Sequence, residues 1–282
     1  MKIAITGGTG FVGSHLDRAL ALLGHQVVIV TRQQFGKSAL LADALKGCDS
    51  VAHCVGINRE ADGQTYEGVH VEGTRRVVQA AKEMEVGRIV LLSYLRARPG
   101  TRFSYFESKW QSEELVRSSG IDYSIFKAAM IFGDKDQMLH HLSSSLRRVP
   151  LFASVGMNEK PIRPVAVEDV VSIIQRALID NLFSNQTVPI VGPEEMKLSV
   201  AVRRVSNAIG RKVFIFPMPV AFHYLFAWIG ERVMRTPVVT VAQVRMLAEG
   251  ISEPLPGSPS VPDNLAPKIH MDEARIRQCL VQ

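Results

Sequence analysis

The stretch Thr6-Gly7-Gly8-Thr9-Gly10-Phe11-Val12-Gly13 decides the fold. It follows a short apolar run at residues 2–6 and precedes residues 12–23, where apolar positions recur at helical spacing until Gly24. A glycine cluster between a buried strand and a helix predicts a phosphate-binding turn, because the free N–H groups and the positive dipole of a helix N-terminus attract anions. We therefore expect this loop to bind the pyrophosphate of a dinucleotide.

The glycines of this loop have separate expected roles. Gly7 permits the tight turn, Gly10 lets the backbone approach the pyrophosphate without a Cβ in the way, and Gly13 lets the helix pack closely on the strand. The alternative is a glycine turn that serves packing alone. The cofactor-binding residues that we predict in this loop are Gly7, Thr9, Gly10, Phe11, Val12 and Gly13.

The end of the second expected strand, residues 27–30, indicates which dinucleotide binds. Enzymes that use NAD usually carry an acidic residue there, about 20 residues after the loop, which binds the ribose 2′-hydroxyl. Here the strand ends in Thr31-Arg32, so no acid repels a 2′-phosphate and Arg32 can pair with it. We predict NADP(H) as the cofactor. NAD(H) is the alternative, in which Arg32 is a solvated loop residue.

The first half of the chain continues the alternation of strands and helices. The expected strands are residues 51–55, 88–92 and 123–126, and the expected helices are residues 72–85 and 108–118. This β-α-β alternation predicts an α/β fold, an NAD(P)-binding Rossmann domain with a doubly wound parallel sheet. The segment from Arg32 to Asp49 is too short for the usual helix plus strand, so we expect the third strand to be missing or vestigial.

After about residue 150 the pattern loosens. The expected elements are helices at residues 170–179, 199–209, 220–234 and 240–249, a strand at residues 187–191, and an extended loop at residues 253–267. We therefore predict a Rossmann dinucleotide-binding domain over residues 1–150. A small, mainly helical C-terminal lobe over residues 151–282, interleaved with the Rossmann domain, is expected to hold the substrate.

Composition narrows the classes of function. The 282 residues are 46% hydrophobic, enough for a large core. The net charge of +6 comes from 33 basic and 27 acidic residues, and no stretch is densely basic with interleaved aromatics, so we expect no nucleic-acid partner. The three cysteines have no metal-binding spacing, and we expect no metal. Without an export leader or an apolar run of membrane-spanning length, the sequence predicts a cytoplasmic protein.

Further segments resemble the short-chain dehydrogenase/reductase superfamily, in its extended or atypical, epimerase-like branch. The resemblance covers most of residues 1–195. Besides the glycine loop, the segments that carry it are Tyr105-Phe106-Glu107-Ser108-Lys109, which matches the superfamily's Tyr-x-x-x-Lys, and Gly73-Thr74, Ala80-Ala81, Ile89–Ser93 and Val165–Val170. The implied function is that of an NADP-dependent oxidoreductase, or a related epimerase or dehydratase, acting on a small-molecule substrate that is a carbonyl or lipophilic compound.

Within that superfamily the chain is similar to the group around the Rossmann-like accessory subunit of respiratory complex I. The segments that carry this resemblance are Val55-Gly56-Ile57, His70-Val71-Glu72-Gly73, Thr236-Pro237 and Gln243–Leu247. Val55 and Gly56 join the predicted cofactor-binding residues. The resemblance also implies a second function, that of a non-catalytic NADP(H)-binding assembly, sensor or interaction protein.

The superfamily resemblance assigns chemistry to Tyr105 and Lys109. The tyrosine of that motif is a general acid/base, and the lysine lowers its pKa and holds the nicotinamide ribose. Spacing of i, i+4 puts both side chains on one helix face, as this chemistry requires. Tyrosine needs such help because its unperturbed pKa is near 10.

Departures from the motif leave the catalytic role open. Tyr94 stands where the superfamily has a Ser or Thr, and Ser93, one residue earlier, should point to the opposite side of the strand. Lys127-Ala128 replaces the usual Arg-Pro. The gap before Tyr105 is short and basic, with Arg96, Arg98 and Arg102. The pair is therefore either an active acid/base pair or an inherited pair that holds ribose without the chemistry.

Several histidines and one cysteine are weaker candidates. His53-Cys54 is expected to form part of the cofactor-side wall rather than a metal or nucleophile pair, because no second cluster supports it. His70 is expected to pack or to cap a backbone group, with catalysis as the alternative. His140-His141 is expected to be a solvated pair on a helix.

The helix near residues 220–233 has an apolar face made by Phe222, Leu225, Phe226, Ile229 and Val233, with Trp228 at its flank. We interpret this face first as core or as a lid on a substrate pocket. The alternatives are a dimer or partner face and a membrane-surface contact. A peripheral membrane or protein partner would bind through the apolar segment 213–235, which includes Phe214-Ile215-Phe216. The oligomeric state is open.

Overall fold

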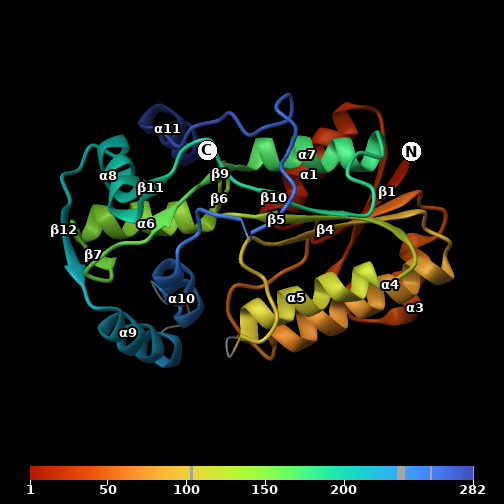
Figure 1. The fold of residues 1–282 in the computed structure, drawn as a ribbon, viewed down its shortest axis with the longest axis horizontal. Helices are drawn as coiled ribbons and strands as arrows, with labels where there is room; N and C mark the ends of the chain where they lie inside the picture. Colours follow the sequence, from red (N-terminus) through yellow and green to blue (C-terminus); the bar gives the residue numbers. More distant parts are fainter. Residues whose placement is uncertain (102–103, 234–238, 255, 282) are drawn as a thin grey trace. The chain divides into compact units, whose positions relative to one another are not determined.

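The computed structural model describes residues 1–101, 104–233, 239–254 and 256–281 (Figure 1). Arg102, Thr236-Pro237 and the end of the apolar segment 213–235 lie outside the described residues. The chain forms two compact units. The first comprises Met1–Ala128, Glu168–Ile190 and Pro254–Ala266, and the second comprises Ala129–Val167, Val191–Glu253 and Pro267–Gln282.

A six-stranded parallel sheet forms the centre of the first unit, in the order β10-β5-β4-β3-β1-β2. Its strands are β1 (Lys2–Thr6), β2 (Gln26–Val30), β3 (Ser50–His53), β4 (Arg88–Tyr94), β5 (Asp122–Ala128) and β10 (Gln186–Ile190). The order is that of the doubly wound fold, except that β2 is an edge strand where a third strand would otherwise pair. The predicted fold class and the predicted absence of that strand are confirmed.

Helices cover both faces of this sheet. They are α1 (Phe11–Leu22), α2 (Arg32–Phe35), α3 (Ser38–Leu45), α4 (Glu72–Glu83), α5 (Ser104–Arg117) and α7 (Val167–Ile179). Figure 1 shows α1 and α7 on one face and α3, α4 and α5 on the other. On the second face, Leu41 and Leu45 of α3 and Val77 of α4 are fully buried against the strand residues Val51 and Ile89. Burying each such side chain stabilises the fold by ~2 kcal/mol.

The second unit is small and mainly helical. Its helices are α6 (Gln137–Arg148), α8 (Leu198–Ala208), α9 (Val220–Val233), α10 (Val241–Glu249) and α11 (Glu273–Val281). Its strand pairs are β6 (Ile131–Phe132) with β9 (Val165–Ala166), β8 (Pro161–Ile162) with β11 (Met196–Lys197), and β7 (Leu151–Val155) with β12 (Phe214–Met218). Among the described residues, none of the helices has the length and apolarity needed to traverse a bilayer.

The apolar face of α9 corrects one expectation. We first interpreted that face as core or as a lid, but Phe222, Phe226 and Val233 are exposed. The helix uses its other side for the core, where Ala227 is fully buried in a cluster with Val155 and Val244. The interpretation of the outer face as core is therefore wrong. The expected helix pair His140-His141 does lie on α6, partly or fully exposed.

Candidate functional site

The glycine loop joins β1 to α1 by a turn that only glycine fits. Gly7 has φ +74°, and a Cβ on it would lie 3.0 Å from the backbone of Cys54 and Val55. A Cβ on Gly13 would lie 2.2 Å from the Gly7 carbonyl oxygen, far inside van der Waals contact. The Gly10 N–H donates to the same oxygen at 2.9 Å. The tight turn at Gly7 and the close packing at Gly13 follow the expectation from sequence. The approach of a pyrophosphate to Gly10 stays a prediction.

The N-terminus of α1 is open to an anion. Its N-cap, Gly10, offers no side-chain cap, and its first turn contains no acidic residue. Thr9 and Gly10 are exposed, whereas the Val12 side chain is buried, so Val12 can offer a ligand only its N–H. Phe11 is half-buried against the His15 ring. Uncapped N–H groups and the helix dipole make this end of α1 suited to bind phosphate.

The residues after β2 form a capped helical turn. Thr31 is the N-cap of α2, and its side chain accepts from the Gln34 N–H while the Gln34 side chain accepts from the Thr31 N–H. Arg32 is the first residue of that helix and is exposed. The capping box holds Thr31 in place, so the end of β2 offers an exposed guanidinium and no carboxylate.

Helix α5 presents Tyr105, Lys109 and Glu113 on successive turns of one face. All three are buried, with exposed fractions of 5%, 8% and 0%. The i, i+4 pair expected from the sequence is thus present and directed inward. Glu113, the third member, was not predicted, although its spacing from Lys109 repeats the same interval.

Aromatic rings enclose Tyr105. Edge contacts at centroid distances of 5.4 to 5.6 Å join its ring to the rings of Tyr66, His70 and Tyr94. Its hydroxyl lies 3.5 Å from the Asn58 Oδ1. Burial raises the pKa of Tyr105 above its usual value, and the Tyr66 phenol acts in the same direction. In this conformation Tyr105 is a neutral proton donor.

The Lys109 ammonium sits beside the loop that follows β3. A Cβ on Gly56 would lie 3.0 Å from Lys109 Nζ, so the absence of a side chain at Gly56 leaves room for the charge. Burial lowers the pKa of Lys109 to about 8, while Glu113 and Cys54 act in the opposite direction. Because residues 54–55 also contact Gly7, the structure brings the glycine loop, Val55, Gly56 and Lys109 to one edge of the sheet.

His70 lies in η1 (Glu67–Val71), a single π-helical turn before α4. Its Nε2 accepts from the Ile57 N–H at 3.1 Å, so the proton is on Nδ1 and is donated to the Ser108 Oγ at 2.9 Å. The Ser108 hydroxyl in turn donates to the Tyr105 carbonyl oxygen at 3.0 Å. His70 thus ties the β3 loop to α5, in agreement with the expected packing and capping role.

His53 extends this polar chain to β1. The Thr74 hydroxyl donates its proton to the His70 carbonyl oxygen, so Thr74 Oγ1 accepts from the Nε2–H of His53 at 3.0 Å. The other ring nitrogen of His53, Nδ1, therefore accepts from the Thr6 hydroxyl at 2.6 Å. Burial, and secondarily Lys109, lowers the pKa of His53 to about 3 and that of His70 to about 2. Both histidines are therefore neutral structural groups.

The chemistry of Cys54 is also set by burial. Burial raises the pKa of the Cys54 thiol to about 12, which makes it a poor nucleophile at neutral pH. The described residues hold no cluster of three or more His, Cys, Asp or Glu suited to a metal ion. His53, buried between Thr6 and Thr74, and the protonated Cys54 thiol therefore do not form a reactive pair, and their place in the wall of a cofactor site stays a prediction.

Ser93 and Tyr94 have different surroundings. The Ser93 hydroxyl donates to Glu113 Oε1 at 2.5 Å. The Tyr94 ring contacts Tyr105 and stacks on Phe106 with centroids 5.2 Å apart. Ser93 therefore does not replace the missing Ser or Thr, and a phenol occupies the place beside Tyr105.

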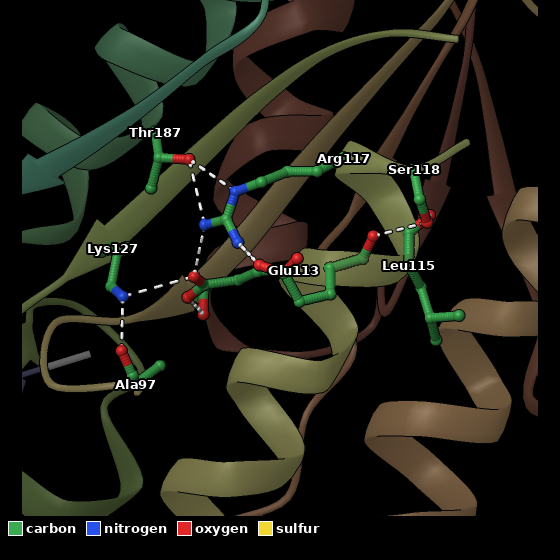
Figure 2. A network of polar contacts seen from close by, with 9 residues as sticks. Ala97, Glu113, Leu115, Arg117, Ser118, Lys127 and Thr187 are labelled. Carbon is green, nitrogen blue, oxygen red and sulfur yellow. Dashed lines mark hydrogen bonds and ion pairs between the residues drawn. The ribbon is translucent and has the colours of Figure 1, made fainter. Parts of the chain in front are cut away.

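A buried charge network supports the inner end of this face (Figure 2). Glu113 Oε2 accepts from Arg117 at 2.7 Å and from Lys127 Nζ at 3.3 Å. Lys127 also donates to the Ala97 carbonyl oxygen at 2.6 Å, and Arg117 reaches Thr187 of β10. Lys127, the residue that departs from the superfamily's Arg, thus still supplies a cation to α5. The sequence did not point to Glu113, Asn58 or Tyr66. Asn58 and Tyr66 lie in a loop without a periodic pattern.

Comparison with known proteins shows the family to which the chain belongs. Residues 3–187 match the NAD dependent epimerase/dehydratase family. The structure of UDP-N-acetylglucosamine 4-epimerase from Bacillus cereus superposes with a TM-score of 0.72 at 16% identity, covering 100% of this chain and 98% of that one. This likeness supports the fold.

Two curated relatives are similar in sequence. The mitochondrial NADH-ubiquinone oxidoreductase 40 kDa subunit of Neurospora crassa is 26% identical over 231 residues, covering 74% of this chain and 60% of the subunit. The ceramide reductase of Caulobacter vibrioides is 27% identical over 184 residues, covering 59% of this chain and 57% of the reductase. The chain thus spans about 60% of the length of these relatives. The expected resemblance to a complex I subunit is confirmed, and the chain belongs to the NAD dependent epimerase/dehydratase family.

Proposed function

We propose that this protein binds NADP(H) and is an oxidoreductase that acts on a lipophilic carbonyl compound. The observation that carries the proposal is the pairing of Tyr105 and Lys109, buried on one face of α5, with the edge formed by Gly56 and the glycine loop. The dinucleotide fits this edge, because the N-terminus of α1 is uncapped, carries no acidic residue in its first turn and begins at the exposed residues Thr9 and Gly10.

Each residue has a defined task in this proposal. The N–H groups at Phe11 and Val12 bind the pyrophosphate, and the Lys109 ammonium donates to the ribose hydroxyls. Tyr105 Oη holds the proton that the substrate oxygen takes up in the reducing direction, and the Asn58 amide positions that hydroxyl. When bound, the nicotinamide supplies or accepts a hydride.

The choice between NADP(H) and NAD(H) rests on Arg32. Arg32 is exposed at the end of β2 and can form a charge-assisted pair with a 2′-phosphate. In a fluorescence titration we expect Arg32→Ala to weaken NADPH binding about tenfold and to leave NADH binding unchanged. Arg18→Ala, on the exposed side of α1, is the matched control. If Arg32→Ala left the affinity for NADPH unchanged as well, Arg32 would be a solvated surface residue.

The proposed substrate class follows from the walls around Tyr105. The rings of Tyr66 and Tyr94, which pack against Tyr105, are largely apolar, and no small hydroxyl takes the usual place at Tyr94. An apolar carbonyl compound suits such walls better than a polyhydroxylated sugar does. The ceramide reductase of Caulobacter vibrioides, by its name an enzyme for a lipid, supports this class.

A non-catalytic NADP(H)-binding role is the second candidate. The buried state of Tyr105, with its pKa raised, favours it, as does the relation to the 40 kDa subunit of NADH-ubiquinone oxidoreductase. The two candidate functions can be separated by measuring the rate of NADPH oxidation with a panel of long-chain ketones. The unchanged protein and the Tyr105→Phe variant are compared. If the protein is an enzyme, the rate should be at least about 10²-fold lower in Tyr105→Phe, and the affinity of this variant for NADPH should be unchanged. Tight NADPH binding with no turnover in either protein would support the second candidate.

A further inference from the structure

Helix α9 of the second unit is apolar on both of its sides. On the inner side, Tyr224 and Ala227 pack into a cluster with Val155 and Val244. The His223 ring also faces inward and bonds the Ala153 carbonyl oxygen at 3.2 Å. The outer side carries Phe222, Leu225, Phe226, Ile229 and Val233, with exposed fractions from 42% to 78%. A helix on a water-covered surface normally has a polar outer side, so this outer side requires another explanation.

The strand before α9 adds to the exposed apolar surface. Strand β12 runs directly into α9 (Figure 1). Its Phe214 and Phe216 are two residues apart, stack with centroids 6.1 Å apart, and are 65% and 37% exposed. Phe214 pairs in register with Leu151 of β7, which is 54% exposed. Soluble proteins seldom expose so many large apolar side chains in one chain segment without a binding role.

Cations gather at one end of this surface. Strands β7 and β12 are parallel and in register, and the Phe214 N–H bonds the Pro150 carbonyl oxygen at 2.9 Å, so the segments that precede both strands come together. Those segments carry four exposed cations, Arg147, Arg148, Arg211 and Lys212. At the other end, the Arg232 guanidinium lies 3.7 Å from the centre of the Trp228 ring.

Acidic side chains do not balance these cations locally. Within residues 147–157 and 211–233 Glu231 is the sole acid, and its carboxylate accepts from the Val241 N–H at 2.9 Å. Two copies of the chain joined through this surface would bring two surfaces of the same positive net charge together. The charge therefore favours an anionic occupant over a second copy.

We propose that the outer side of α9, with Phe214 and Phe216, docks on an anionic lipid bilayer. The helix lies in the plane of the interface, its aromatic side chains enter the boundary between headgroups and acyl chains, and the four cations bind lipid phosphates. Trp228 with Arg232 suits the headgroup level, where tryptophan is enriched in membrane proteins. This docking goes beyond the proposed chemistry and does not depend on it.

Trp228 is the reporter for the test, because the chain has only one other tryptophan, Trp110. The Trp110→Phe protein is mixed with phosphatidylglycerol vesicles and with phosphatidylcholine vesicles, with and without brominated acyl chains. We expect flotation with the anionic vesicles, a blue shift of Trp228 emission and quenching by the brominated chains. Raising the salt concentration should weaken binding, because part of the attraction is electrostatic.

Matched variants test each half of the surface. Phe222→Ser/Phe226→Ser should reduce vesicle binding at least about tenfold, whereas Leu22→Ser/Leu23→Ser, which removes exposed leucines from α1, should not. Arg211→Gln/Lys212→Gln should weaken anionic binding about tenfold or more, whereas Lys37→Gln/Lys46→Gln should have little effect. All four pairs include exposed side chains, and circular dichroism checks that each variant is folded.

Three outcomes would overturn the proposal. The first is no binding to anionic vesicles. The second is an equal loss of binding in the α9 variant and in the Leu22/Leu23 control. The third is a lipid-free dimer in sedimentation that Phe222→Ser/Phe226→Ser dissociates, which would assign the surface to self-association. Retained NADPH binding in a variant that no longer binds vesicles separates failure of docking from failure of the proposed function.

Discussion

At the scale of one residue, the buried charge of Lys109 reduces the stability of the fold. The residue is 8% exposed, and burial holds the pKa of its ammonium at about 8 rather than 10.5. The unfolded chain therefore binds this proton more tightly than the native state does. Stability should rise with pH between about 8 and 10.5, and the full penalty for the buried charge should apply below pH 8. The proposed cofactor-binding role of Lys109 would be a reason to keep such a charge.

We predict that Lys109→Met stabilises the protein by about 3 kcal/mol at pH 7, because the shift of about 2.5 pKa units is removed with the charge. The same variant should lose most of its NADPH affinity. Urea unfolding at pH 7 and at pH 10, with a cofactor titration, checks both parts. The gain in stability should shrink at the higher pH. A variant less stable than the parent at pH 7 would contradict the electrostatic explanation.

At the scale of elements, one buried carboxylate joins α5 to two strands. Glu113 accepts from Lys127 of β5 and from Arg117 of its own helix (Figure 2). It also accepts from Ser93 of β4. Removing one partner of such a buried pair leaves uncompensated charge, whereas replacing both with apolar or neutral groups is often neutral. Glu113 also raises the pKa of Lys109, so the network acts on the proposed site.

We predict that Glu113→Gln lowers the free energy of unfolding by about 3 kcal/mol, because Lys127 is left buried without its counter-ion. The double variant Glu113→Gln/Lys127→Met should recover at least half of that loss. The midpoints of urea unfolding of Glu113→Gln, Lys127→Met and the double variant, compared with the parent protein, form a double-mutant cycle. Additive losses would show that the two side chains are not coupled.

The cap of α6 gives a second prediction at this scale. Asp136 accepts from the Met138 N–H at 2.8 Å, but burial raises the pKa of its carboxyl to about 6 from 3.8. The native state holds this proton more tightly than the unfolded chain does, so stability should fall as pH rises from about 4 to 6.

Asp136→Asn keeps a good capping side chain and removes the buried charge. We expect a gain of about 1 kcal/mol above pH 6, because the shift of about two pKa units is partly offset by the lost attraction to the helix dipole. Below pH 4 the gain should vanish. Thermal unfolding measured from below pH 4 to above pH 6 gives this gain in stability. Asp136→Ala, which loses the capping side chain, is expected to be less stable than the parent protein. A gain independent of pH would exclude the charge as its cause.

Sequence periodicity predicted the elements whose pattern is local. The continuous apolar runs that became β1, β3 and β4 are typical of parallel strands covered on both faces. Helices α2 and α3 were not predicted, because both are short and α3 is ordered by its packing against α4, a contact that no local pattern reveals. The pairing of β7 with β12 joins residues about sixty apart in the chain, which no local pattern reveals. Glu113 and His70 could be assigned only once their partners from other elements were in place.

At the scale of the whole molecule, the chain passes between the two units five times, at residues 128–129, 167–168, 190–191, 253–254 and 266–267. The apolar strand pattern identified the Rossmann part, but a division by residue number does not describe two units whose segments alternate along the chain. Unfolding either unit alone would leave its segments as loops pinned by the other, which limits the entropy gained. Such connectivity favours unfolding of both units in a single cooperative transition.

The two tryptophans allow this to be tested, because Trp110 lies in α5 of the first unit and Trp228 in α9 of the second. We predict that Trp110→Phe and Trp228→Phe unfold in urea with the same midpoint. NADPH at about 100 times its Kd should stabilise both by about 2.7 kcal/mol, although the proposed cofactor edge belongs to the first unit alone. A shift confined to the Trp110 signal would mean that the units unfold independently, and that the alternating connectivity does not couple the cofactor edge to α9.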